Sequence, residues 1–227
     1  MAKVKVKKKR INWKKVILAI LLLYVIVYLF YSALNSPIRN IYVKGNTILS
    51  DQEIIELVGL QNYPSNLSQT SLGMEKKLEK NPFIKEATVK KKIFNQVWIS
   101  ITEHKILCYQ NGTQELLFED GTKLKVEKNQ YNVPNLINAI PDEYQKLFVQ
   151  KMANLTDEVI RKISEIEYKP NDIDKERFLF SMNDGNYVYI TLKKIKKLND
   201  YDKIIPYTEG NKGVFYLDSG DYFKILE

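Results

Sequence analysis

Cys108 and His104 are the residues of this sequence best suited to covalent chemistry, because a thiol becomes a strong nucleophile beside a base. The chain has 1 cysteine and 1 histidine, so it offers no other pair of this type. In a single strand the two residues share one face but lie about 13 Å apart, beyond hydrogen-bond reach. A lone cysteine among apolar neighbours is more often a small buried residue. We therefore predict no catalytic residue.

Metal and phosphate sites are not indicated either. A zinc site needs three or four cysteine, histidine or carboxylate ligands. The 9 glycines are scattered at turns and match neither standard spacing of a phosphate-binding loop. Asp172 and Asp174 could be paired acids, but their Pro-Asn-Asp context is typical of a turn. We predict no metal site, no cofactor and no small-molecule substrate.

The positive charge of the chain is concentrated at its start. Residues 1–15, MAKVKVKKKRINWKK, hold 8 of the 35 basic residues, so residues 16–227 carry 27 bases against 27 acids. A domain that binds nucleic acid keeps clustered cations of its own, because its affinity comes from counterion release. We therefore predict no nucleic-acid partner, and we interpret residues 1–15 as a cytoplasmic basic tail.

An uncharged segment follows the basic tail. Residues 16–38, VILAILLLYVIVYLFYSALNSPI, carry no formal charge. As a helix they extend roughly 35 Å, enough for a hydrocarbon core of about 30 Å. The apolar run is longer than that of a cleaved signal peptide, and residues 32–35 offer a poor cleavage site. Positive flanks stay cytoplasmic, so we predict a signal anchor over residues 16–36 of a single-pass type II protein of the cell membrane.

Residues 37–106 have the patterns of a small domain. The stretch IRNIYVKGNTILSDQEIIELVGL predicts a strand, a Gly45-Asn46 turn and a helix over residues 51–58, which begins with the capping box Ser50 and Glu53. We expect a second helix over residues 71–80 and strands over residues 84–91 and 97–103. The predicted order is β-α-α-β-β, a sheet with two helices on one face.

Residues 107–227 predict a mixed β domain with antiparallel strands and peripheral helices, so the fold class is α+β. Asn-Asp-Gly-Asn at residues 183–186 indicates a hairpin. The predicted strands are residues 106–109, 116–118, 123–126, 178–182, 187–192, 214–217 and 222–225, the predicted helices are 142–154, 156–163 and 194–204, and residues 135–139 are expected to be irregular. The last strand is either internal or an edge strand able to pair with a partner.

The order of these motifs resembles the FtsQ/DivIB family of bacterial cell-division proteins. Val43 to Asn46 with Val-x-Gly-Asn, followed by LEKNPFIKEATVKKKIFNQVWISITEH, is similar to the POTRA domain of that family. The stretches ISEIEYKP, MNDGNYVYITL, KLNDYDKI and GVFYLDSGDYF are similar to its β domain. The resemblance therefore extends over nearly the whole chain.

This resemblance implies a non-enzymatic scaffold of the divisome, enriched at the division septum. The implied partners are the coiled-coil proteins FtsL and DivIC/FtsB outside the membrane, with the septal peptidoglycan synthase complex as a further one. The implied role is to help control septal peptidoglycan synthesis. The end of the β domain binds DivIC/FtsB by strand addition in the family, which assigns partner binding to Gly220, Tyr222 and Phe223. Gly213, Val214 and Leu217 are expected to shape the sheet.

Two alternatives share the predicted topology. A sortase-like surface enzyme needs a cysteine with a separate histidine and arginine, and its Thr-Leu-x-Thr-Cys signature is absent around Cys108. A generic POTRA transport or chaperone protein fits the first domain but is not expected to concentrate at the septum.

Overall fold

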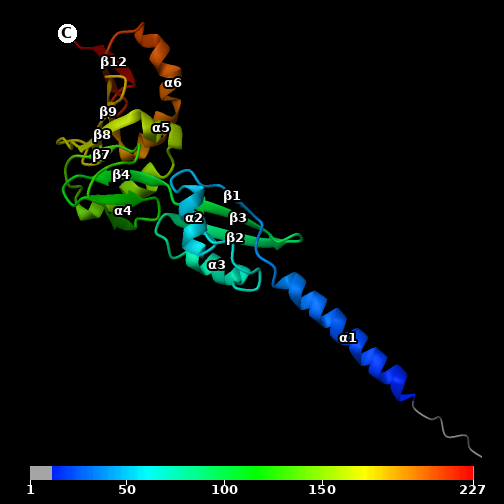
Figure 1. Ribbon diagram of the computed structural model, residues 1–227. Coiled ribbons are helices and arrows are strands. Elements are labelled where there is room, and N and C mark those ends of the chain that lie inside the picture. The colour runs from blue at the N-terminus through cyan, green and yellow to red at the C-terminus, as the bar shows by residue number, and fades with distance from the viewer. Residues whose placement is uncertain (1–11, 227) are drawn as a thin grey trace, which may run out of the picture. The chain divides into compact units, whose positions relative to one another are not determined.

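The structure is a computed structural model that describes residues 12–226 (Figure 1), so most of the predicted basic tail, residues 1–11, lies outside the described residues. The chain divides into two compact units, residues 1–102 and residues 103–227. The first unit begins with α1 (Trp13–Leu34). Its segment Trp13–Ser32 is long and apolar enough to cross a membrane, and the large apolar side chains of this segment are exposed.

The first unit continues with a three-stranded sheet and two helices, in the predicted β-α-α-β-β order. The strands lie in the order β1-β3-β2, and β1 is parallel to β3. Ile54 of the first helix and Met74 of the second belong to one buried cluster with Val97 and Ile99 of the sheet. The elements are β1 (Asn40–Lys44), α2 (Asp51–Val58), α3 (Ser71–Leu78), β2 (Ile84–Lys92) and β3 (Gln96–Glu103).

The caps of α2 form as the sequence predicts. The Ser50 hydroxyl accepts from the Glu53 N–H, and the Glu53 carboxylate accepts from the Ser50 N–H at 2.8 Å. Gly59 ends the helix in the left-handed conformation, with φ of 75°.

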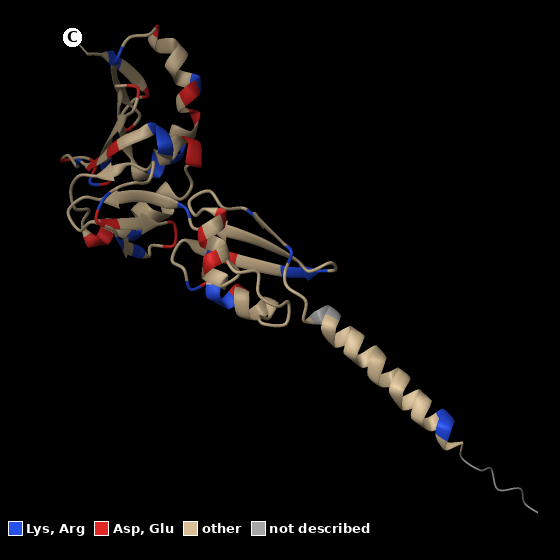
Figure 2. Ribbon diagram, viewed as in Figure 1, with Lys and Arg blue, Asp and Glu red and all other residues tan. Residues whose placement is uncertain are grey.

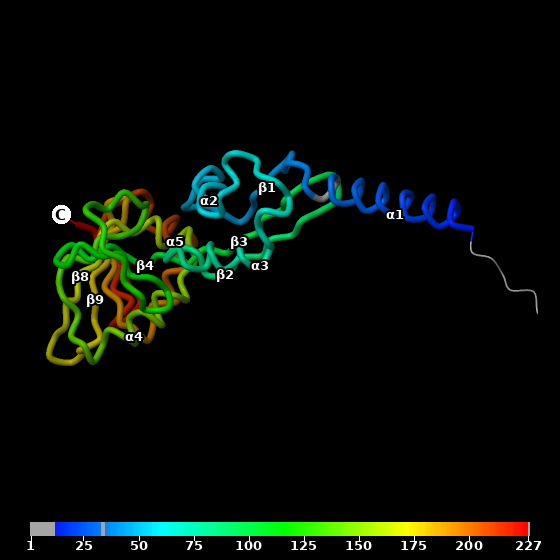
Figure 3. Tube along the Cα trace, turned by 60° about the horizontal axis from the view of Figure 1, so that its bottom comes forward, coloured from blue at the N-terminus to red at the C-terminus, as the bar shows by residue number. Residues whose placement is uncertain are grey.

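The second unit is built on a nine-stranded sheet in the order β12-β11-β10-β9-β8-β7-β4-β5-β6. Its buried cluster includes Phe148, Phe178 and Phe180. β8 and β9 run side by side in the sheet (Figures 1 and 3). The strands are β4 (Ile106–Gln110), β5 (Glu115–Phe118), β6 (Lys123–Lys125), β7 (Asn135–Leu136), β8 (Ile163–Tyr168), β9 (Arg177–Met182), β10 (Tyr187–Thr191), β11 (Gly213–Tyr216) and β12 (Tyr222–Ile225).

The helices of this unit precede β8 or connect β10 to β11. They are α4 (Asp142–Met152), α5 (Asp157–Lys162), the 3-10 helix η1 (Leu192–Asp200), α6 (Tyr201–Ile204) and the 3-10 helix η2 (Ile205–Thr208). β9 and β10 form the predicted antiparallel hairpin around residues 183–186. β10 and β11 are parallel, because η1, α6 and η2 form the crossover between them.

The structure differs from the sequence prediction in three places. Residues 163–168 were not predicted as a strand, but α5 ends at Lys162 and Ile163 begins β8 with an extended backbone. The segment expected to be irregular contains β7, which pairs with β4 and with β8. The predicted helix 194–204 is divided into η1 and α6, because Ile195, Leu198 and Tyr201 recur every three residues, the period of a 3-10 helix.

Candidate partner-binding edge

β12 is an edge strand of the nine-stranded sheet. It pairs with β11 in antiparallel register, and within residues 12–226 no strand pairs with its other side. The N–H of Leu226 donates to the Lys212 carbonyl at 3.0 Å. Hydrogen-bonded and non-hydrogen-bonded pairs alternate in such a ladder, so the N–H groups of Phe223 and Ile225 point away from β11. The strand therefore turns backbone N–H and C=O groups toward its open side.

The three residues predicted to bind a partner occupy different environments on this edge. Gly220 is exposed in the turn between β11 and β12. Tyr222 begins β12 and is 51% exposed. Phe223 is partly buried and packs on Phe215 of the core, with ring centroids 4.6 Å apart. The side chain of Tyr222 is thus exposed to solvent, whereas that of Phe223 packs inward.

A ladder of stacked side chains crosses the sheet and ends at Tyr222. The Arg177 guanidinium lies 3.6 Å above the ring of Tyr189. The ring of Tyr189 stacks on Tyr216 with centroids 5.3 Å apart, and Tyr216 stacks on Tyr222 at 4.7 Å. Each pair of rings comes from residues directly opposite in the register of neighbouring strands. The ladder holds the ring of Tyr222 against the sheet at its open edge.

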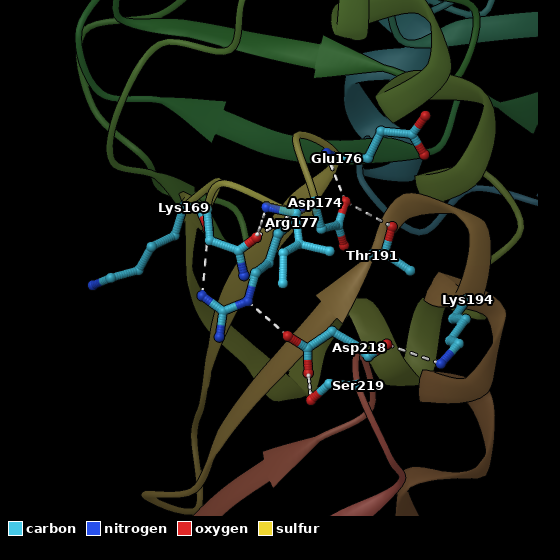
Figure 4. A network of polar contacts seen from close by, with 10 residues as sticks. Lys169, Asp174, Glu176, Arg177, Thr191, Lys194, Asp218 and Ser219 are labelled. Carbon is cyan, nitrogen blue, oxygen red and sulfur yellow. Dashed lines mark hydrogen bonds and ion pairs between the residues drawn. The ribbon is translucent and has the colours of Figure 1, made fainter.

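A partly buried ion pair holds the turn before β12 to the start of β9 (Figure 4). The Arg177 Nε donates to the Asp218 Oδ2 at 2.6 Å, and the Ser219 hydroxyl donates to Asp218 Oδ1 at 3.1 Å. The ammonium of Lys194 donates to the Asp218 carbonyl at 3.0 Å. Burial raises the pKa of Asp218, but the hydrogen bonds from Arg177 and Ser219 outweigh it, so the pKa lies below its usual value. The carboxylate is therefore ionised at neutral pH.

A second polar cluster positions β11 against the β9–β10 hairpin. The Gly213 N–H donates to the buried side-chain oxygen of Asn186 at 3.0 Å. The Tyr201 hydroxyl donates to the Asp184 carboxylate at 2.9 Å, and burial raises the pKa of Tyr201. Asp184 and Asn186 belong to the Asn-Asp-Gly-Asn stretch, which sequence reasoning assigned to the turn alone.

Gly213 has no room for a side chain. An added Cβ would lie 2.3 Å from the Lys224 carbonyl oxygen and 2.6 Å from the Phe223 ring, both on β12. β12 therefore packs closely on β11 at Gly213. The expectation that Gly213 shapes the sheet fits this close approach.

Cys108 and His104 are not in one strand as assumed from the sequence. Cys108 lies in β4 and is fully buried, and burial raises the pKa of its thiol to about 12. His104 lies in the link between β3 and β4, where its Nδ1 is 4.0 Å from carboxylate oxygens of Glu119 and of Asp120. Among the described residues, no group of three or more histidine, cysteine or acidic residues is arranged to hold a metal ion.

Comparisons with known proteins match both parts of the chain. The family model described as a POTRA domain of FtsQ type matches residues 36–104. The cell division protein DivIB of Listeria monocytogenes is 29% identical over 96% of this chain and 83% of the relative. The DivIB protein of Geobacillus kaustophilus is 30% identical over 91% of this chain and 82% of the relative. A solved structure of the major extracytoplasmic domain of DivIB from Geobacillus stearothermophilus is 27% identical and covers 48% of this chain and 96% of that domain, with a TM-score of 0.40.

Proposed function

This chain belongs to the DivIB family of cell-division proteins, and from that premise we propose that it is a non-enzymatic, membrane-anchored scaffold of the bacterial division complex. Its partners in this proposal are FtsL and DivIC/FtsB, and through them the complex that makes septal peptidoglycan. The protein is enriched at the septum, with its N-terminus in the cytoplasm, α1 in the membrane and residues 37–227 outside it. The 8 basic residues in residues 1–15 support this orientation, because positive flanks stay cytoplasmic.

The open side of β12 is the observation that carries the proposal. An incoming strand gains affinity from backbone hydrogen bonds to the edge, here to Phe223 and Ile225, and specificity from alternate side chains. Tyr222 and Lys224 alternate with them along β12 and are exposed. A partner strand therefore meets one tyrosine ring and one ammonium group on the same face of the sheet.

Site-specific photo-cross-linking in growing cells tests this docking mode. We expect a cross-linker that replaces Tyr222 to capture a small bitopic coiled-coil protein. Tyr207 is the matched control, because it is a tyrosine of the same unit and is 84% exposed. Equal yields from both positions, or an adduct only from Tyr207, would exclude docking at this edge.

A pair of substitutions at Ile225 separates backbone from side-chain recognition. Ile225→Pro removes an N–H that points away from β11, which an edge strand tolerates, and Ile225→Ala keeps that N–H. We expect Ile225→Pro to lower the cross-linking yield from Tyr222 about tenfold, since one backbone bond is lost and the incoming strand is obstructed. Ile225→Ala should retain most of the yield. If proline has no larger effect than alanine, strand addition is not the mode of binding.

A further inference from the structure

Two loops of the first unit are fixed beside the end of α1, and we call residues 61–68 and 93–95 the exit loops. The Asn66 N–H donates to the Ser36 carbonyl at 3.0 Å, and the Ile38 N–H donates to the Pro64 carbonyl at 3.0 Å. From the second loop, the side-chain amide of Asn95 donates to the Ser36 hydroxyl at 2.5 Å. Ser36 directly follows Asn35, the C-cap residue of α1. Both exit loops are therefore bound to the residues at which the chain leaves this helix.

The exit loops expose large apolar side chains. Ile93 is 77% exposed and Phe94 is 76% exposed at the turn between β2 and β3, and Tyr63 and Leu67 are about half exposed in the other loop. As far as the structure describes it, the buried cluster of this unit contains none of these four residues. Clustered exposed apolar side chains of this kind mark a contact surface.

The two aromatic residues also hold a backbone conformation that side chains disfavour. The φ angles are 62° at Phe94 and 47° at Tyr63, in the region that glycine or asparagine occupies at lower cost. The turn at residues 93–95 would form more readily with glycine or asparagine in place of Phe94. Phe94 and Tyr63 are therefore not the residues that best suit these backbone conformations. We take this as a sign that their side chains have a role outside the local fold.

The segments that form and flank the exit loops carry charge of a single sign. Residues 35–44, 60–74 and 87–102 contain no aspartate or glutamate. Arg39, Lys90 and Lys92 are exposed, and basic positions gather at the end of β2 beside the turn (Figure 2). Lys91 instead points inward and donates to the carbonyls of Asn66 and Gln69. This surface suits an anionic partner with an apolar interior.

We propose that the exit loops are a membrane-contact site for anionic phospholipid. Tyr63, Leu67, Ile93 and Phe94 enter the interface between headgroups and acyl chains, where aromatic and apolar side chains with basic neighbours are favoured. Arg39, Lys90 and Lys92 meet the lipid phosphates. We choose a bilayer as the occupant because the membrane-anchoring helix α1 ends beside the exit loops. A second membrane contact next to α1 would fix the orientation of the sheet and helices of the first unit on the membrane surface. The inference rests on the anchoring part of the proposed function and not on docking at β12.

Depth-dependent quenching in proteoliposomes tests the contact with the full chain. A fluorescent label is attached at Phe94→Cys in a Cys108→Ala background, in vesicles of phosphatidylethanolamine and phosphatidylglycerol that contain a lipid spin-labelled near the headgroup. Ile173→Cys is the matched control, because it replaces an isoleucine that is 96% exposed in the second unit. We expect a blue-shifted emission and severalfold stronger quenching at position 94 than at position 173. Equal quenching at both positions in protein that floats with the vesicles would overturn the inference.

Further outcomes distinguish membrane contact by the exit loops from membrane anchoring by α1. Protein that does not float with the vesicles contradicts the anchoring role of α1 itself. The double substitution Lys90→Glu and Lys92→Glu should reduce quenching at position 94 in anionic vesicles and leave it unchanged in phosphatidylcholine vesicles. If position 94 stays in water in vesicles but cross-links to a protein in cells, the exit loops bind a protein and the membrane contact is wrong.

Discussion

Asp218 is a single residue that helps to position the β12 edge of the sheet. It follows β11 closely, and its ion pair with Arg177 reaches the first residue of β9, across β10. The side chains of Arg177 and Asp218 are only 13% and 7% exposed. Removing one member of such a pair leaves the other charge buried without compensation.

We expect Asp218→Asn to lower the free energy of unfolding by roughly 2 kcal/mol at neutral pH. The folded-state pKa of Asp218 lies below its unfolded value, so the stabilising effect of its charge is present above about pH 4 and is lost as the pH falls through the folded-state pKa. Denaturant unfolding at several pH values should therefore show the two proteins converging in acid. Asp172→Asn, at an exposed loop position, is the control. A difference in stability that does not change with pH would contradict this assignment.

Cys108 gives a test of the non-enzymatic proposal at the same scale. Its thiol is buried and protonated at neutral pH, because burial raises the pKa to about 12. We expect no alkylation by iodoacetamide in the folded protein, complete alkylation after unfolding, and normal division in cells that carry Cys108→Ala. Mass spectrometry and complementation measure these outcomes. Loss of division at normal protein levels would instead favour an enzyme that uses this thiol.

At the scale of elements, the contact between β11 and β12 determines whether the edge exists. We expect Gly213→Ala to push β12 away from β11, since the added Cβ meets the Lys224 carbonyl and the Phe223 ring. Hydrogen exchange should become faster at the amides of Tyr222 and Lys224 and stay slow in β8 and β9. Gly112→Ala is the control, because nothing lies within 4 Å of its added Cβ. Unchanged exchange in β12 would show that the strand adapts without opening.

Local signals predicted some elements better than others. α2 was predictable because its start and stop are encoded within it, by the capping box at Ser50 and by Gly59. β8 was missed because its residues continue the apolar spacing of α5, and only pairing with β9 and β7 makes them a strand. β7 has two residues, too few for any periodicity. Strands that form only by pairing with segments far away in the sequence cannot be predicted from local sequence patterns.

At the scale of the whole molecule, the sequence predicted the α+β class and the apolar N-terminal helix, and the structure confirms both. The resemblance to the FtsQ/DivIB family is confirmed by the family model and the relatives. The edge position of β12 was left open, because it follows from the order of nine strands. The assignment of partner binding to Gly220, Tyr222 and Phe223 stays a prediction, and the inward packing of Phe223 is a tertiary feature that the motif alone does not contain.

The place of β12 in the strand order also affects what an incomplete protein does. A ribosome makes the nine strands of this sheet in numerical order, so β12 at the outer edge is the last of them to be synthesised. A nascent or prematurely terminated chain that stops before Tyr222 leaves β11 without its neighbour. In the docking mode proposed here, such fragments lack the strand that pairs with the partner. They therefore do not compete with finished molecules for the partner.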